Sequence, residues 1–291
     1  MTMGEEVELP SRYEIRPLEL KHVEWAKAIF AHSFVFSPTS IWRSLYPSGQ
    51  TARFYGLYQA SDYLIRHQVA SGLSLGLFDS EYVFQQPNSA ATGGALYFDF
   101  ADPDIDGDGL LKQMDTPLVS IACAFDAFYA LDTRRIAPVM GRLPASASFH
   151  AALEERACTP DPNTATITKT KTKTKTTATT GWECKPPTAP CQVLRRMGTA
   201  TRADAEGAGL MKATAHSMMR RAADRGFRAI EIACFHDAVT AVWANPPLPF
   251  TGCVAGEVDT YALDEVGVDG RRRFPYRPVR RRLTKVYVTL R

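Results

Sequence analysis

The sequence predicts a single α/β domain. Strand-like and helix-like stretches alternate along most of its 291 residues. Hydrophobic residues make up 45% of the chain and charged residues 22%, values typical of a globular protein with a substantial core. The most informative region runs from residue 193 to residue 235. There a strand pattern, a glycine-rich turn, an amphipathic helix and a second strand pattern follow one another without interruption.

The first expected elements are a short strand and two helices. Residues 13–18 alternate apolar and polar side chains, as a half-buried strand does. Apolar residues at three- and four-residue spacing predict helices over 23–30 and 54–70, and Gly72 is a suitable end for the second helix.

Three apolar runs follow in the first half of the chain. Residues 73–78 and 95–100 are strand candidates, and we expect them to pair as neighbours. Residues 117–125 fit either a strand or a buried helix, because periodicity alone does not distinguish the two for so short a run.

Residues 160–190 interrupt the globular pattern. This segment alternates lysine and threonine, ends in a proline cluster, and has almost no large apolar side chains. Such a composition buries too little surface to offset the entropy lost on ordering. We expect a disordered insertion within one domain that spans residues 1–291, because the strands before the segment have no partner until the residues after it supply one.

After the insertion, residues 193–202 predict a strand and residues 210–225 a helix with an apolar stripe. Gly226 stands where a left-handed helix cap is common. A strand over 229–235 and a short helix over 236–245 come next.

The last predicted strand covers residues 285–290, and their sequence is K-V-Y-V-T-L. Its β-branched and aromatic residues favour a strand.

The turn before the long helix carries the pattern of an anion site. A helix leaves its first backbone N–H groups unpaired, and its dipole adds partial positive charge there. Gly207 and Gly209 would let a phosphate approach these groups closely. The alternative is an ordinary tight turn between a strand and a helix. A dinucleotide fingerprint is absent, because Lys212 occupies the place of its third glycine, and no P-loop sequence occurs.

This arrangement resembles the GNAT superfamily of N-acetyltransferases, and in particular uncharacterised fungal-type members. The family motif [Gln/Arg]-x-x-Gly-x-[Gly/Ala] between strand and helix falls on residues 204–209, D-A-E-G-A-G. The segment Y-E-I-R-P-L before a helix is similar to the first strand of the family. The first motif position is Asp204, so either Arg202 compensates its charge or the register is shifted. The resemblance implies the GNAT-like acyl-CoA N-acyltransferase fold, a mixed, mostly antiparallel sheet flanked by helices.

The resemblance also implies an activity, acetyl transfer from acetyl-CoA as co-substrate to an unidentified small-molecule amine. The coenzyme would lie along the strand and the turn, with its pyrophosphate on the amides of the turn. The residues implied in binding it are Thr199, Ala200, Thr201, Arg202, Glu206, Gly207, Ala208, Gly209, Leu210 and Trp243.

Two side chains are candidates for the proton-accepting base of this reaction. The unperturbed pKa of a histidine lies near neutrality, and His236 follows the strand that would line the cofactor slot. Glu231 is the alternative on the same strand. A histidine that starts a helix or fills the core is the competing interpretation of His236. Many family members carry a tyrosine in the last helix that protonates the departing thiolate, and at that spacing this chain has Trp243.

The chain leaves two other functional classes open. Without the tyrosine, it could be a non-catalytic coenzyme-A-binding protein. Residues 271–291 contain eight Arg, one Lys and no acidic residue, a charge that could bind nucleic acid, an import receptor or the coenzyme's adenosine phosphates. We favour a solvated charged edge before the last strand over a nucleic-acid site. The aromatic-rich segment 34–58 is either core or, as the resemblance implies, a pocket for an apolar or aromatic amine.

No metal and no membrane contact are expected. The six cysteines form no C-x-x-C pair, so no zinc site is predicted. The acidic loop 102–109 imitates the start of a calcium loop but has Gln113 where a glutamate is required. There is no signal-peptide pattern and no apolar run long enough to span a bilayer. We therefore expect a cytoplasmic protein, with the nucleus as an alternative because of the basic segment.

Overall fold

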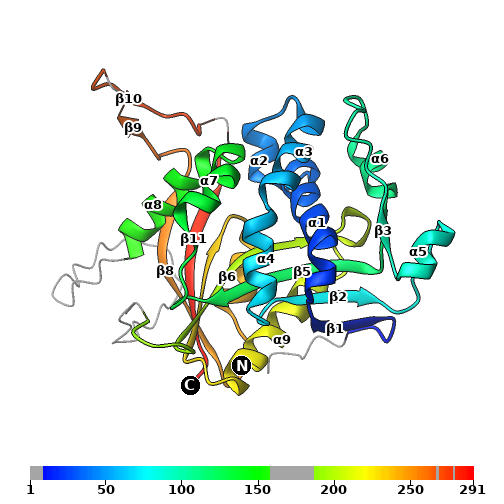
Figure 1. The fold of residues 1–291 in the computed structure, drawn as a ribbon. Coiled ribbons are helices and arrows are strands. Elements are labelled where there is room, and N and C mark those ends of the chain that lie inside the picture. The colour runs from blue at the N-terminus through cyan, green and yellow to red at the C-terminus, as the bar shows by residue number, and fades with distance from the viewer. Residues whose placement is uncertain (1–8, 158–186, 267–268, 278) are drawn as a thin grey trace.

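The computed structural model describes residues 9–157, 187–266, 269–277 and 279–291, so most of the predicted insertion at 160–190 lies outside the described residues. Seven strands form one sheet in the order β1-β2-β5-β6-β7-β11-β8 (Figure 1). All neighbouring strands of this sheet are antiparallel except β6 and β7, which are parallel. The predicted fold class, a mixed and mostly antiparallel sheet flanked by helices, is confirmed.

The elements before the insertion are, in chain order, β1 (Tyr13–Pro17), α1 (Val23–Phe36), α2 (Ile41–Leu45), α3 (Gln50–Ala60), α4 (Asp62–Ala70), β2 (Leu75–Asp79), α5 (Pro87–Thr92), β3 (Ala95–Leu96), α6 (Gly107–Lys112), β4 (Met114–Asp115), β5 (Leu118–Asp126), α7 (Thr133–Arg142) and α8 (Ala145–Ala157). The elements after it are β6 (Val193–Thr201), α9 (Leu210–Asp224), β7 (Ala229–Cys234), α10 (Asp237–Ala244), β8 (Thr251–Asp259), β9 (Glu265–Val266), β10 (Arg272–Arg273) and β11 (Arg282–Thr289).

Two expectations for the first half are wrong. The helix expected over 54–70 is two helices, because the chain bends at Ser61, whose hydroxyl donates to the Tyr58 carbonyl. The runs 73–78 and 95–100 do not pair: β2 lies between β1 and β5, whereas the short β3 pairs with β4. All five residues of β2 are buried, as a central strand requires, and the positive φ angles of Gly93 and Gly94 turn the chain just before β3.

The sheet is covered on both faces. A large core cluster joins α1, α3, α4 and α8 to one face, through fully buried side chains such as Phe54 and Phe149. A second cluster joins α9 and α10 to the other face, with Met219 and Trp243 at its centre. β5 pairs with β6 over most of its length, so the segments on either side of the insertion belong to one sheet.

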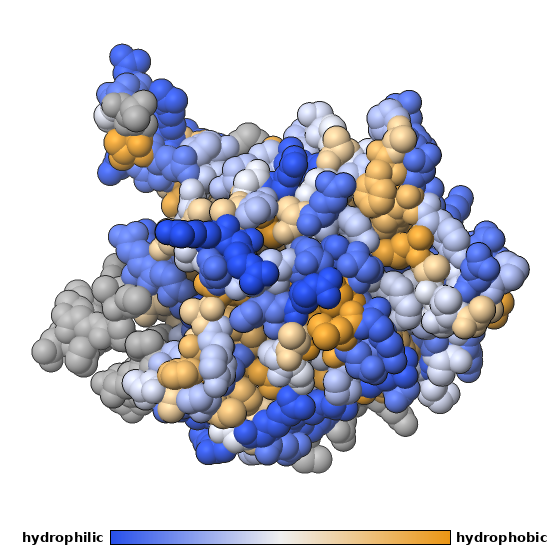
Figure 2. Space-filling model, viewed as in Figure 1, coloured by the Kyte–Doolittle hydropathy of each residue, from blue (hydrophilic) through white to orange (hydrophobic). Residues whose placement is uncertain are grey.

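Three arginines of the basic C-terminal segment lie beside carboxylates. Arg272 lies 3.2 Å from Asp264, and Arg273 lies 3.0 Å from Asp269. Farther along, Arg282 lies 3.3 Å from Glu257. The ribbon of β9 and β10 projects from the body (Figure 1) and its surface is largely hydrophilic (Figure 2). These contacts agree with a solvated charged edge.

A buried histidine couples the fold to pH. His22 lies between Trp25 and Phe78, is 2% exposed, and accepts the Glu19 N–H at Nδ1. Burial lowers the pKa of His22 to about 4, from an ordinary 6.5. The unfolded chain therefore takes up this proton more readily, so stability is lost as the pH falls from about 6.5 towards 4.

We expect His22→Asn to flatten this pH dependence. The free energy of unfolding should change by about 2–3 kcal/mol less between pH 6.5 and 4 in the variant than in the native protein. Urea unfolding at a series of pH values measures the difference, and equal slopes for the two proteins would refute it.

Candidate functional site

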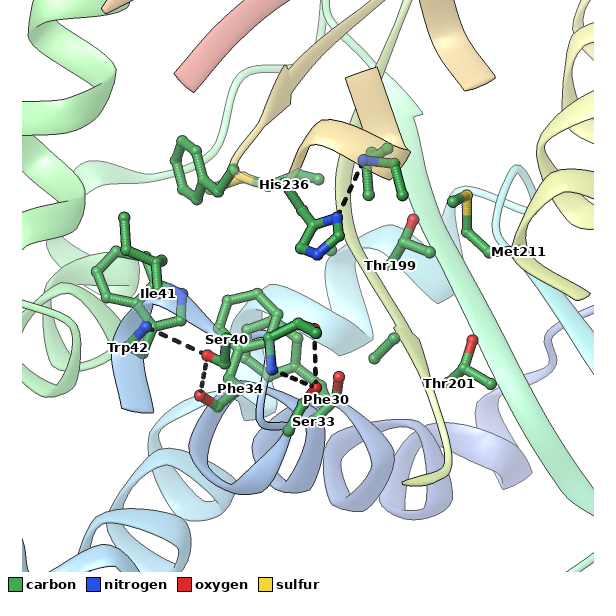
Figure 3. Close-up of a pocket in the computed structure, with 18 of the residues that line it drawn as sticks. Phe30, Ser33, Phe34, Ser40, Ile41, Trp42, Thr199, Thr201, Met211 and His236 are labelled. Carbon is green, nitrogen blue, oxygen red and sulfur yellow. Dashed lines mark hydrogen bonds between the residues drawn. The ribbon is translucent and has the colours of Figure 1, made fainter. Parts of the chain in front are cut away.

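A cavity of about 570 Å³ lies where β6 and β7 separate. Its walls come from α1, α2, α7, α8, β6, the turn before α9, and the start of α10 (Figure 3). The two strands pair only from Val193–Ala229 to Arg196–Ile232. Beyond Arg196, β6 stays paired with β5 alone, so the edge of residues 197–201 that faces β7 is open to the cavity.

An irregularity in β6 shapes this edge. The register with β5 shifts between Ala122 and Ala124, opposite Met197 and Gly198. Gly198 has a φ of 97°, a conformation that favours glycine, and a Cβ there would meet the Phe30 ring at 3.5 Å. Such a bulge bends a strand and frees backbone groups. An extended ligand can pair with the free groups as an added strand would.

The turn before α9 presents unpaired amides at the mouth of the cavity. Gly207 and Gly209 have φ angles of 83° and 74°, and Gly209 is the N-cap of α9. Within the described residues, no acceptor binds the backbone N–H groups of 207–211. Added Cβ atoms at both glycines would meet nothing within 4 Å. The turn therefore combines free donors, a helix dipole and open space, as an anion site does.

Arg202 neutralises the carboxylate at the first motif position. Its guanidinium holds Asp204 through two hydrogen bonds, of 2.8 and 3.1 Å, and also donates to the Thr116 carbonyl at 2.9 Å. Of the two alternatives that the sequence left open, the compensating one is observed. Because Arg202 is buried in these contacts, its side chain does not reach the cavity wall, contrary to its predicted place in the cofactor site.

Most of the predicted binding residues do line the cavity. These are Thr199, Ala200, Thr201, Glu206, Gly207, Gly209 and Leu210, together with His236. Four predicted site residues are absent from the wall, namely Arg202, Ala208, Glu231 and Trp243. Ala208 is exposed in the turn. Trp243 belongs to α10, and its side chain is 1% exposed in the core between this helix and the sheet.

Glu231 belongs to a buried ion cluster, which argues against its predicted role as a base. It is bound by Arg195 and the Tyr287 hydroxyl, and Lys285 lies 3.8 Å away. Burial alone would raise the pKa of Glu231, but the charges of Arg195 and Lys285 outweigh it and hold that pKa below its usual value. A carboxylate stabilised in this way is a poor proton acceptor.

The ring of His236 reaches into the cavity from the start of α10 (Figure 3). Its Nδ1 accepts the Ala238 N–H at 3.0 Å and so caps the helix. In the neutral ring the proton must then be on Nε2, and His236 presents a donor to the cavity. The helix-start interpretation of this histidine therefore holds, and its free nitrogen cannot accept a proton while the cap is in place.

A second histidine on the wall has the opposite tautomer. His150, in α8, has its Nδ1 2.8 Å from the Ser146 carbonyl oxygen, which can only accept, so the proton is on Nδ1. Its Nε2 is then an acceptor, and no described residue binds it. Burial lowers the pKa of His150, against the smaller effects of the Ser146 carbonyl and of Glu154, so the neutral form is favoured. Sequence reasoning missed this residue, because nothing local sets it apart.

Aromatic side chains form the end of the cavity beneath α1 and α2. The Phe34 and Trp42 rings are stacked with centroids 6.3 Å apart, and Trp42 meets Phe235 edge-on at 5.8 Å. Ser40 fixes this corner, because its hydroxyl donates to the Phe34 carbonyl and accepts the Trp42 N–H (Figure 3). Among the residues that line the cavity, the one carboxylate is Glu206, in the turn near α9.

No group of side chains suited to holding a metal occurs in the described residues. Among the helices that the structure describes, none has the length and apolar character needed to cross a membrane.

Comparison with solved structures relates this fold to known proteins. The C-terminal condensation domain of Ebony, solved in complex with beta-alanyl-dopamine, has a TM-score of 0.51 and 14% identity, over 94% of this chain and 97% of that one. Arylalkylamine N-acetyltransferase 2 from Aedes aegypti has a TM-score of 0.50 and 9% identity, over 96% and 99% of the two chains. Putative arylalkylamine N-acetyltransferase 7 from the same mosquito has a TM-score of 0.56 and 9% identity, over 96% and 88%. Comparisons of the sequence with protein-family models and with curated proteins find no match.

Proposed function

We propose that this chain, which has the fold of the GNAT N-acetyltransferases, transfers an acetyl group from acetyl-CoA to the amine of a small molecule. One observation carries the proposal: the unpaired amides at the start of α9 adjoin a strand edge that has separated from its neighbour. An anion site beside an open strand edge suits a molecule with a phosphorylated end and an extended amide-bearing arm, as coenzyme A has.

Acetyl-CoA would lie with its pyrophosphate on the amides of residues 207–211. Its pantetheine arm would pair with the open edge of residues 197–201, and the thioester would then lie towards Arg196, where β6 and β7 close. The Glu206 carboxylate lies 3.4 Å from the Ser37 hydroxyl, which ties the turn to the end of α1.

The cavity suits an amine with an aromatic or apolar body. Phe34, Trp42 and Phe235 provide rings on which such a body can pack. A polyamine would need several carboxylates, and the single one on the wall lies at the phosphate end. Two of the similar structures are named as arylalkylamine N-acetyltransferases, and the third contains an amide of an aromatic amine, which supports this choice.

We assign the proton-accepting role to His150. In the reaction the amine must lose a proton as it attacks the thioester carbonyl. His150 lines the cavity and has an unprotonated Nε2, whereas the Nε2 of His236 carries a proton. His236 can instead donate a hydrogen bond to an oxygen of the substrate.

An amine panel tests the function. The protein is incubated with acetyl-CoA and a series of primary amines, and the release of free thiol is followed. We expect phenylethylamine-like amines to be acetylated with kcat/KM at least about 10-fold above that of spermidine, because unpaired cations are costly in an aromatic site. A faster reaction with spermidine would contradict the assigned substrate class.

The same assay separates catalysis from mere binding. If acetyl-CoA binds but no amine accelerates thiol release, the chain is a non-catalytic coenzyme-A-binding protein. The observation that supports this alternative is the absence of the family's tyrosine, whose place is taken by Trp243.

A further inference from the structure

Arg196 is a buried cation without a counter-ion. It is the last residue of β6 that pairs with β7, it lines the cavity, and it is 7% exposed. In the part of the chain that the structure describes, its Nε has no hydrogen-bond partner and no carboxylate forms an ion pair with it. Its guanidinium carbon lies over the Trp243 ring, 5.7 Å from the ring centroid.

The ionisable groups nearest to Arg196 do not balance its charge. These are the thiols of Cys123 on β5 and Cys234 on β7, and both are fully buried. Burial raises the pKa of the first thiol to about 12 and that of the second to about 11, so both are neutral at physiological pH. Burial lowers the pKa of Arg196 only to about 10, which leaves the guanidinium charged. A buried charge left unpaired is strongly unfavourable, so an anionic ligand group is expected beside it.

The position of Arg196 limits what this ligand group can be. Thr201, at the end of β6 next to the turn, is five residues further on, which is about 16 Å along a strand. A pyrophosphate held by the turn is therefore out of reach. The group that meets Arg196 is at the opposite end of the arm, where the sulfur of the thioester lies.

We propose that Arg196 holds the coenzyme A thiolate as it leaves, an assignment that rests on the proposed function. The amine nitrogen attacks the carbonyl carbon, and its proton passes to His150. The carbon–sulfur bond then breaks with its electron pair on sulfur, and the Arg196 guanidinium donates N–H groups to that sulfur. The thiolate finally takes up, through solvent, the proton that His150 accepted, so that neutral coenzyme A and the free base are both restored. Arg196 thus stabilises the leaving group electrostatically, with no need for the proton that a tyrosine would supply.

The pKa of the bound coenzyme A thiol is the direct test. The thiolate absorbs in the ultraviolet, so the native protein and Arg196→Met are titrated with pH, each with and without coenzyme A. In the native protein we expect the thiol pKa to fall by about 1–2 units relative to free coenzyme A. In Arg196→Met the fall should vanish, and in Arg196→Lys, which keeps the charge, much of it should remain.

Three accompanying measurements exclude a structural role. With an accepted amine, kcat should fall about 10²–10³-fold in Arg196→Met, while the Kd of acetyl-CoA should change by less than about 3-fold. The melting temperature of Arg196→Met without ligand should be equal or higher, because a desolvated charge has been replaced by an apolar chain of similar length.

The outcomes separate this proposal from the proposed function. If calorimetry finds no binding of coenzyme A to the native protein, the proposed function fails, and this assignment with it. If coenzyme A binds but its thiol pKa is unshifted, or equally shifted in Arg196→Met, only the thiolate assignment is overturned. Succinyl-CoA provides a further test of the thiolate assignment. If it binds much more tightly than acetyl-CoA to the native protein but not to Arg196→Met, the guanidinium binds a carboxylate of the acyl group and the assignment is overturned.

Discussion

Replacing Gly209 with glutamate is expected to lower the affinity for acetyl-CoA at least about 100-fold, which corresponds to roughly 2.7 kcal/mol. The new side chain would extend from the N-cap of α9 into the open space in front of the unpaired amides. Its carboxylate would both occupy the phosphate site and repel the pyrophosphate charge. Isothermal titration calorimetry of the two proteins with acetyl-CoA measures the change.

Gly49 provides a matched control for this substitution. It is also the N-cap of a helix, α3, with a φ of 65°, and an added Cβ there would likewise meet nothing within 4 Å. Gly49→Glu therefore introduces the same charge and a similar backbone strain, about 1–2 kcal/mol, away from the cavity. We expect equal losses of stability in the two variants and a loss of affinity in Gly209→Glu alone. If Gly209→Glu bound acetyl-CoA as tightly as the native protein does, the turn before α9 would not be the phosphate site.

The part of the site that is continuous in sequence could be predicted from the sequence. The strand at 193–202, the glycine turn and the helix at 210–225 correspond to β6, the turn and α9 within a residue or two. Local rules decide each of these features: strand propensity, glycine at positive φ, and an amphipathic stripe. The same rules predict that Gly207 and Gly209 belong to an anion site, without any knowledge of the tertiary structure.

The end of the cavity near Arg196 could not be predicted in this way. Arg195 and Arg196 are adjacent and chemically identical, yet the first pairs with Glu231 on one face of the sheet and the second is buried without a partner on the cavity wall. The pairing of β6 with β7 decides which of these two arginines lies beside Trp243, and this pairing joins segments that are separated in the sequence. The unpaired state of Arg196 is therefore recognisable only in the folded chain.

The roles of the two cavity histidines depend on partners that the sequence does not reveal. His236 follows a strand and is the candidate base that the sequence predicts. In the structure, however, its acceptor nitrogen Nδ1 already binds the Ala238 N–H and caps α10. His150 lies in α8, whose small alanine and serine residues give a weak helical pattern, so neither the helix nor its histidine was predicted. One backbone carbonyl, that of Ser146, sets the tautomer that makes His150 the better acceptor.

Exchanging His150 for glutamine should therefore reduce kcat/KM for an accepted amine about 10²–10⁴-fold, the range typical of a lost general base. Glutamine is well tolerated in a helix, so α8 should persist. In the native protein, protonation of His150 should produce an acidic limb in the pH profile of kcat/KM. Because burial lowers the pKa of this residue, the limb should lie below the ordinary histidine value, and it should be absent from His150→Gln.

His236→Asn is the matched comparison, because asparagine is a strong N-cap and keeps α10 in place. This variant removes the donor at Nε2 but no proton acceptor, so we expect a fall of about 10-fold or less, with the acidic limb retained. The profiles of both variants are measured with the same amine. If His236→Asn lost the limb and His150→Gln kept it, the helix cap would have to open during the reaction, and the base would be His236. The test thus depends on a single physical point: a ring nitrogen that already accepts a backbone N–H is not free to accept the proton of the amine.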